Sequence, residues 1–215
     1  LGSKFVDQGG NAYRYVKVGG TATVAGKLYQ APAEVTNHQA LTPVAASIGA
    51  TSVTTTLGAT AATANQYAEG YLMITITPGE GYKYLLKGHA AIDSSGTGTF
   101  NLSDPLQVAL TTSSRIDLVL NPYSGVIVNP TTASSCPVGV AVDVVAAASY
   151  GWLQTGGVAN VLADGTVTVG TTLVASNGTA GAVEAFTGVQ AIVGIAVTGI
   201  ATTDYGAVKL TFDVG

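Results

Sequence analysis

Residues 13–20 read Y-R-Y-V-K-V-G-G, and residues 150–157 read Y-G-W-L-Q-T-G-G. When the two stretches are aligned, aromatic residues match aromatic residues: Tyr13 with Tyr150, and Tyr15 with Trp152. Each stretch also ends in a pair of glycines. We therefore expect two related β units, with the two stretches as equivalent strands. Two copies are too few for a solenoid, so a small barrel in which each half supplies strands to the other is predicted.

Two further landmarks follow each stretch in the same order, a glycine-to-leucine step and a V-G-x-A-V string. They occur at 26–28 and 138–142 in the first copy, and at 170–173 and 193–197 in the second copy. The gap between them is far longer in the first copy, which predicts an insertion there. The expected parts are an N-terminal arm (1–12), a β-barrel domain (13–35 plus 130–215) and an inserted β subdomain (36–129).

Most segments alternate apolar and polar residues and are rich in Val, Thr, Ile and Tyr, with Gly, Pro, Asn or Asp at their ends. In segment 207–212, for example, Val208, Leu210 and Phe212 share one face while Lys209 lies on the other. This is the pattern of a half-buried antiparallel strand. The chain is therefore predicted to be all-β.

Charged residues make up only 9% of the chain, against about 25% in an ordinary soluble domain, and the mean hydropathy is +0.41. A surface with so few charges does little to discourage contact with other proteins, so we expect a homo-oligomer that works in an assembly. The apolar stretches 138–148 and 191–200 are too short to span a bilayer, so no membrane partner is expected. A net charge of -4 with scattered Lys and Arg excludes a nucleic-acid-binding protein.

The ionisable residues form no catalytic or metal-binding pattern. The twelve carboxylates are dispersed, and no G-x-S-x-G motif occurs. His38 and His89 have no Cys, His or carboxylate at ligand spacing, so we expect histidines that are exposed or hydrogen-bonded. The sequence thus predicts no catalytic residue, no metal and no cofactor. A small hydrolase whose site is assembled from distant loops is the enzyme alternative.

The aromatic residues of the repeated stretch fit two interpretations. Aromatic side chains two residues apart lie on one face of a strand and can form a platform for carbohydrate. Alternatively, they pack in the core or in a subunit interface. We favour packing, because aromatic residues that recur in both copies are expected to do the same structural job in each.

Much of the chain resembles a family of tailed-phage head proteins, the capsid decoration or cement proteins. The resemblance is carried by residues 150–176, by G-A-V-E-A at 181–185 and by V-G-I-A-V at 193–197. Residues 11–15 and 26–32, G-E-G-Y-K-Y at 79–84 and N-P-Y-S-G-V at 121–126 are similar to the same family. The resemblance implies a β-barrel protein, commonly a trimer, on the outer surface of an icosahedral capsid. Its partner there is the major capsid protein, at junctions between subunits.

The function expected from the sequence is therefore capsid decoration, with the protein located on the virion. A phage fibre or adhesin domain that binds a host surface glycan is the alternative. Residues 1–12 have a composition that does not fold alone but can order on a partner. We expect Lys4, Phe5 and Arg14 to contact the capsid, with the two cations facing an acidic surface. Fraying of the chain end is the competing interpretation of this arm.

Overall fold

The computed structural model describes residues 1–188 and 190–213. These residues form β-strands and one short 3-10 helix, Thr36–His38, which confirms the prediction of an all-β fold. The chain divides into two compact units. The barrel unit comprises Leu1–Ala33 and Pro122–Gly215, and the inserted unit comprises Glu34–Asn121.

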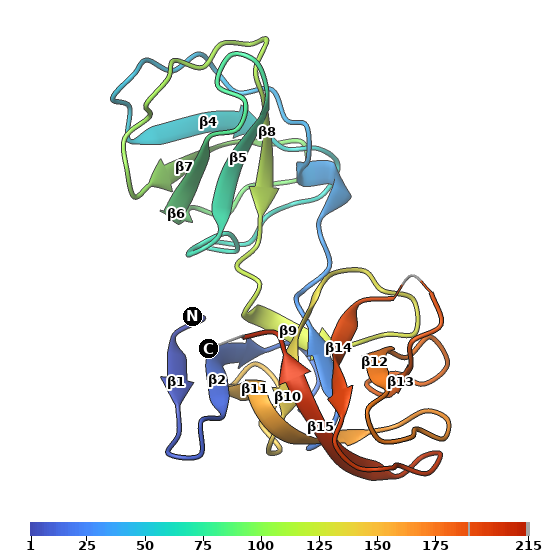
Figure 1. Cartoon of the computed structure of the whole chain (residues 1–215). Coiled ribbons are helices and arrows are strands. Elements are labelled where there is room, and N and C mark those ends of the chain that lie inside the picture. Colours follow the sequence, from blue (N-terminus) through green and yellow to red (C-terminus); the bar gives the residue numbers. More distant parts are fainter. Residues whose placement is uncertain (189, 214–215) are drawn as a thin grey trace. The chain divides into compact units, whose positions relative to one another are not determined.

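Ten of the described strands form the sheet of the barrel unit, in the order β1-β2-β9-β3-β10-β11-β15-β14-β12-β13, with β2 also paired to β11 (Figure 1). They are β1 (Lys4–Val6), β2 (Ala12–Val18), β3 (Leu28–Gln30), β9 (Ser124–Val128), β10 (Pro137–Ala141), β11 (Tyr150–Leu162), β12 (Thr172–Ala175), β13 (Val183–Ala185), β14 (Ile192–Ala196) and β15 (Tyr205–Thr211).

The pairing of β2 with β11 closes a first barrel of five strands, β2, β9, β3, β10 and β11. Its interior is filled by alternate residues of these strands, among them Val16, Tyr29, Val126 and Leu153. The predicted N-terminal arm is part of this structure, because β1 pairs antiparallel with β2 and extends the sheet beyond the barrel.

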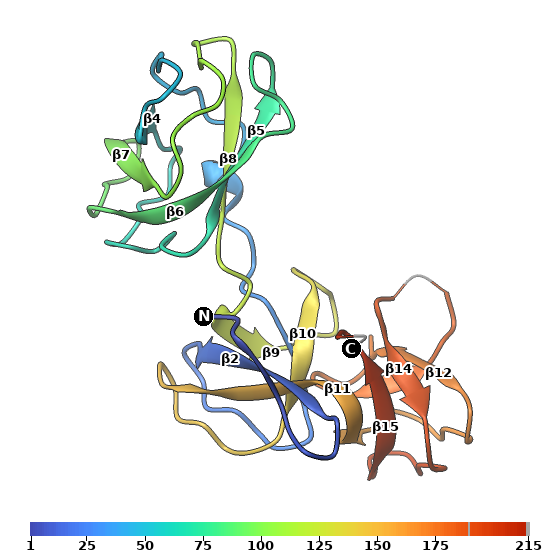
Figure 2. The ribbon, with the colours of Figure 1, turned by 60° about the vertical axis from the view of Figure 1, so that its left-hand side comes forward.

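A second barrel begins where the first one ends, on the same strand. The second half of β11 pairs with β15, the sheet continues through β14 and β12 to β13, and a parallel bridge between Ala163 and Val183 leads back to the end of β11 (Figure 2). Val161, Leu173 and Val208 belong to its core. One 13-residue strand therefore serves both barrels.

The two barrels have the same topology, which confirms the prediction of two related β units. The second half of β11 takes the place of β2, and β15 takes the place of the first half of β11. In the same way β13 corresponds to β9, β12 to β3 and β14 to β10. Each corresponding pair of neighbours runs in the same relative direction, including the single parallel contact in each barrel.

The residue alignment predicted from the aromatic stretches is wrong. Tyr15 and Trp152 lie directly opposite each other in neighbouring strands, and do not occupy equivalent positions. The strand register gives the true correspondence: Gly151 faces Val16 in the first barrel as Gly206 faces Val161 in the second. The equivalent sequences are G-T-A-T-V at 20–24 with G-T-V-T-V at 165–169, and Y-G at 150–151 with Y-G at 205–206. The match of the V-G-x-A-V strings is confirmed, because Gly139 faces Tyr29 in the first barrel as Gly194 faces Leu173 in the second. By the same register Leu28 corresponds to Thr172, so the match of the two leucines in the glycine-to-leucine step is wrong by one residue.

The glycines of these Y-G pairs share one packing role. A Cβ atom on Gly151 would lie 2.5 Å from Cγ2 of Val145, and a Cβ atom on Gly206 would lie 2.5 Å from Cγ1 of Ile200. Each glycine thus makes room for a branched side chain that precedes the strand. This repeated contact supports the corrected alignment independently of the strand register.

The inserted unit has its own sheet and core. Its strands are β4 (Ser52–Thr56), β5 (Tyr71–Ile76), β6 (Lys83–His89), β7 (Thr97–Leu102) and β8 (Arg115–Val119), in the order β4-β7-β6-β5-β8. Bridges from Leu41 to Ile116 and from Pro43 to Thr55 link the two outer strands of this sheet. The core is built mainly from leucine, isoleucine and aromatic side chains.

The insertion is shorter than the predicted range 36–129. Residues 124–128 form β9, which pairs with β2 and β3 and so belongs to the first barrel. The insertion therefore occupies the connection between β3 and β9. In the second barrel the equivalent connection is the short hairpin 176–182 between β12 and β13.

We expect the barrel unit to fold when residues 34–121 are replaced by an Asn-Gly turn like that at 177–178, because the second barrel closes over such a turn. Trp152, the single tryptophan, lies in the barrel unit and reports its folding. Its emission spectrum and a cooperative thermal transition should match those of the full chain. A shortened chain without a cooperative transition would contradict the division into two units.

Candidate binding surface on the first barrel

Five aromatic side chains gather on the outside of the first barrel, and we call them the aromatic strip: Phe5, Tyr13, Tyr15, Tyr150 and Trp152. They come from β1, β2 and β11. In β2 the residues alternate, so that Val16 and Val18 point into the barrel while the tyrosines point outward. The hairpin that returns β1 to β2 adds Phe5 opposite Tyr13.

The rings of the aromatic strip contact one another in a continuous row. Ring centroids lie 6.0 Å apart for Phe5 and Tyr13, 5.9 Å for Phe5 and Trp152, and 5.2 Å for Tyr15 and Trp152. Tyr15 also stacks on Tyr150, with centroids 5.9 Å apart and ring planes 12° apart. Phe5 and Tyr150 each keep more than half of their surface exposed, at 52% and 55%. These rings are therefore not core residues.

The second barrel shows that the fold does not require this strip. At the positions equivalent to Tyr15 and Trp152 it carries Asn160 and Ala207, which face each other in the same register. Among the strip residues only Tyr150 has an aromatic counterpart, Tyr205. The sequence-based argument for a shared packing role therefore fails, because it relied on the wrong alignment. The strip is a feature that the first barrel has and its twin lacks.

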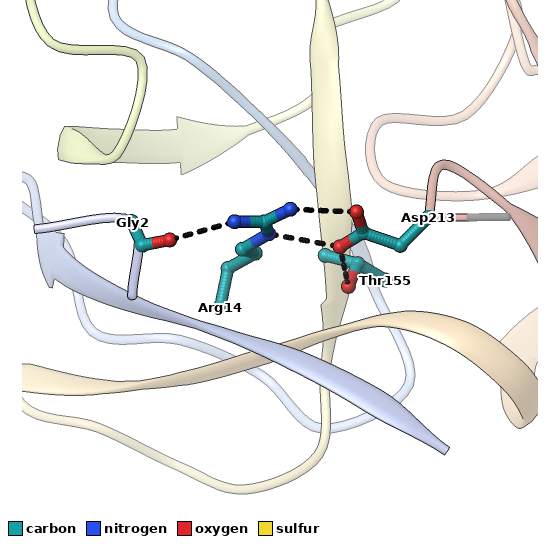
Figure 3. A network of polar contacts seen from close by, with 4 residues as sticks. All are labelled: Gly2, Arg14, Thr155 and Asp213. Carbon is teal, nitrogen blue, oxygen red and sulfur yellow. Dashed lines mark hydrogen bonds and ion pairs between the residues drawn. The ribbon is translucent and has the colours of Figure 1, made fainter. Parts of the chain in front are cut away.

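Arg14, predicted to contact a partner, is half-buried and bound to other residues of the barrel unit (Figure 3). Its Nε and Nη2 atoms donate to the Asp213 carboxylate at 2.8 and 2.7 Å, and its Nη1 atom donates to the carbonyl of Gly2 at 2.9 Å. Thr155 Oγ1 donates to the same carboxylate at 2.7 Å. The Arg14 side chain is 26% exposed and that of Asp213 is 16% exposed. Arg14 thus joins both ends of the barrel unit to β2.

These contacts also set the acidity of Asp213. Hydrogen bonds from Arg14 lower the pKa of this carboxyl to about 2, with help from Thr155 and from the positive charge of Lys4. Lys4 lies opposite Arg14 in the strand pair, whereas Phe5 lies opposite Tyr13. The three predicted contact residues are therefore divided: Phe5 joins the aromatic strip, Lys4 is exposed on the other face of β1, and Arg14 is an internal clamp.

Both histidines are buried in the inserted unit and are hydrogen-bonded around Tyr67. His38 Nε2 donates to the Thr60 carbonyl at 2.8 Å, and its Nδ1 atom is hydrogen-bonded to the Tyr67 hydroxyl. His89 Nδ1 donates to the carbonyl of Ala90 at 2.7 Å, so its Nε2 atom accepts the backbone N–H of Tyr67 at 3.2 Å. The His89 ring is neutral in this arrangement, because one of its nitrogens donates and the other accepts. Burial lowers the pKa of His89.

Within residues 1–188 and 190–213, no three His, Cys, Asp or Glu side chains cluster as a metal site. No helix in the same described part of the chain is long and apolar enough to cross a bilayer. Comparison of the chain with protein-family models, curated proteins and solved structures finds no match. The aromatic strip is the candidate binding surface that the residues themselves indicate.

The substitution Arg14→Met should lower the free energy of unfolding by about 1–3 kcal/mol at pH 7, because it leaves the Asp213 carboxylate without its charged donor. The folded-state pKa of Asp213 is below its ordinary value, so this stabilisation is present above pH 4. It should be lost as the pH falls from about 4 toward 2. Urea unfolding followed by Trp152 fluorescence measures both effects. Lys4→Met is the matched control and should change stability by less than about 0.5 kcal/mol. Equal stability of Arg14→Met and the parent at pH 7 would refute the clamp.

Acid should destabilise the inserted unit through His89. Because burial lowers its folded-state pKa below the unfolded value of 6.5, the unfolded chain binds more protons as the pH falls below about 6.5. Stability then declines by at most about 1.4 kcal/mol per pH unit. Amide hydrogen exchange of residues 34–121, followed in the full chain at increasing urea concentration, reports on this unit, and Trp152 fluorescence follows the barrel unit. His89→Gln should flatten the dependence between pH 7.5 and 5.5, and a slope unchanged by this substitution would count against the assignment.

Proposed function

We propose that this chain is a capsid decoration protein of a tailed phage, which binds the outer surface of the assembled capsid and stabilises it. The observation that carries the proposal is a charge-poor surface with many exposed apolar side chains on both units. Ile48 in the inserted unit is 67% exposed, and Val144 and Val169 in the barrel unit are 66% and 68% exposed. With so few charges among them, such side chains do little to discourage contact with a partner.

The sequence resemblance supplies the identity of the partners. In this proposal the protein sits at junctions between major capsid proteins and associates as a homotrimer. Binding to the assembled lattice alone stabilises it by mass action, by about 2.7 kcal/mol per site when the free protein is at 100 times its dissociation constant. Three copies together turn modest contacts into avid binding. The action is binding, without chemical turnover.

Strand β1 is the element best placed to meet the capsid. It ends the strand order of the barrel unit, and all three of its residues are exposed. An edge strand offers backbone groups for pairing with an extended segment of another chain. Lys4 adds a positive charge at this edge for an acidic capsid surface.

Undecorated capsids should bind the purified protein saturably, release their DNA at a higher temperature when decorated, and show groups of three copies by electron microscopy. Unassembled capsid protein should not bind. Lys4→Glu should lower the affinity about tenfold or less, as expected for one exposed charge contact. Lys209→Glu, an equal charge change on β15, serves as the control. No binding at saturating protein would exclude the proposed function, and equal affinities of the two variants would remove Lys4 from the contact.

A further inference from the structure

We propose that the aromatic strip binds polysaccharide, with successive sugar rings seated on Tyr15, Tyr150 and Trp152. This inference goes beyond the proposed function and uses a different surface from the outer edge of β1. It gives the barrel unit a second ligand, and it places that ligand on the first barrel alone.

The second barrel has no aromatic side chains at the positions of Tyr15 and Trp152. Asn160 and Ala207 occupy the positions of Tyr15 and Trp152 in a barrel with the same topology and register. The fold is therefore satisfied by a small polar residue and a methyl group at these positions. Large rings that the fold does not need, kept partly exposed next to one another, indicate a ligand that uses them.

The chemistry of the rings fits a sugar. The C–H faces of a pyranose pack against aromatic rings, and its hydroxyl groups need polar partners at the rim. Tyr and Trp supply both an apolar body and a polar tip. The centroid spacings of 5.2 and 5.9 Å between Tyr15 and its two neighbours in β11 are comparable with the size of one sugar ring. The hydroxyl of Tyr13, which donates to Asp7 at 3.1 Å, extends this polar rim.

The charges beside the strip favour a polysaccharide of low charge density. Lys17 lies opposite Tyr150, with its Nζ atom 6.0 Å from the ring centroid. The nearby carboxylate of Asp7 is occupied by Asn11 and by Tyr13. These donors are neutral, so Asp7 keeps its negative charge. Lys17 and Asp7 therefore place one charge of each sign beside the strip, which fits a polysaccharide of low charge density.

The size of the strip argues against a protein as its occupant. A stable protein interface buries about 800 Å² on each partner and involves about 20–30 residues on each side. The strip consists of five side chains, two of which keep only a little over half of their surface exposed. A narrow row of rings matches a linear sugar chain better than a second folded domain.

The test uses the full chain and a panel of soluble polysaccharides: hydroxyethyl cellulose, dextran and the acidic polymer alginate. Affinity electrophoresis measures retardation. Because Trp152 is the only tryptophan, its emission also reports binding at the strip directly. The key variant is the double substitution Tyr15→Asn with Trp152→Ala, which installs the residues of the twin barrel and so preserves a combination that this fold accepts. Asn160→Ala, on the second barrel, is the matched control.

We expect at least one polymer to retard the parent protein and shift its Trp152 emission saturably. The double variant should bind that polymer at least about tenfold more weakly, since two ring contacts are lost, with an unchanged thermal transition. Asn160→Ala should bind as the parent does. Absence of retardation by all three polymers, or equal retardation of the double variant, would overturn the proposal.

Two other results would overturn it in favour of a protein partner. One is a loss of capsid occupancy in the double variant, with polysaccharide binding absent in the parent. The other is self-association of the parent in light scattering that the double variant lacks. The capsid assay with Lys4→Glu tests the proposed function separately. A failure of polysaccharide binding therefore leaves capsid decoration standing, and a failure of capsid binding leaves the strip's ligand to be judged from the electrophoresis.

Discussion

The architecture of the barrel unit depends on the sharing of strand β11 between two barrels. Its first half pairs with β2 and so closes the first barrel, and its second half pairs with β15 as the first strand of the second barrel. The change of partner occurs at Gly156 and Gly157. Gly157 has φ +81°, and a Cβ atom there would lie 2.2 Å from Oδ1 of Asn11. A side chain at this position would be strained and would clash with the hairpin that carries β1. At this glycine pair, β11 leaves the first barrel and enters the second.

The two barrels differ on the face with which the first one packs against the second. Leu28 of the first barrel is fully buried in the core cluster of the second barrel, and Gln154, on the other side of Val140, is also buried. Their counterparts on the second barrel, Thr172 and Lys209, are exposed. The second barrel thus carries a polar and a charged residue where the first barrel carries buried ones. Ile195, 44% exposed, is an apolar residue on the same face.

The second barrel also shows which surface residues of the first barrel the fold does not require. Exposed aromatic residues are common enough on β proteins to carry little weight singly. Here the second barrel acts as an internal control, because it has the same strand register without Tyr15 and Trp152. The surface of the first barrel has thus diverged from its twin at positions that the fold leaves free. The two proposals use separate parts of this unit, the outer edge of β1 for the capsid and the strip for sugar.

The sequence by itself determined the fold class, the presence of two related units and the existence of an insertion. The alternation of apolar and polar residues and the order of the repeated motifs are local features of the sequence. They can therefore be recognised without knowledge of the tertiary contacts. Only the tertiary structure decided which residues are equivalent. Tyr15 and Trp152 face each other on one surface and share one environment, and both are aromatic. The sequence alignment treated this similarity as a sign that they occupy equivalent positions in the two barrels. The contacts of Arg14 also came only from the structure. Its ion-pair partner, Asp213, lies 199 residues away in the sequence, and no local pattern predicts a contact that forms only in the folded chain.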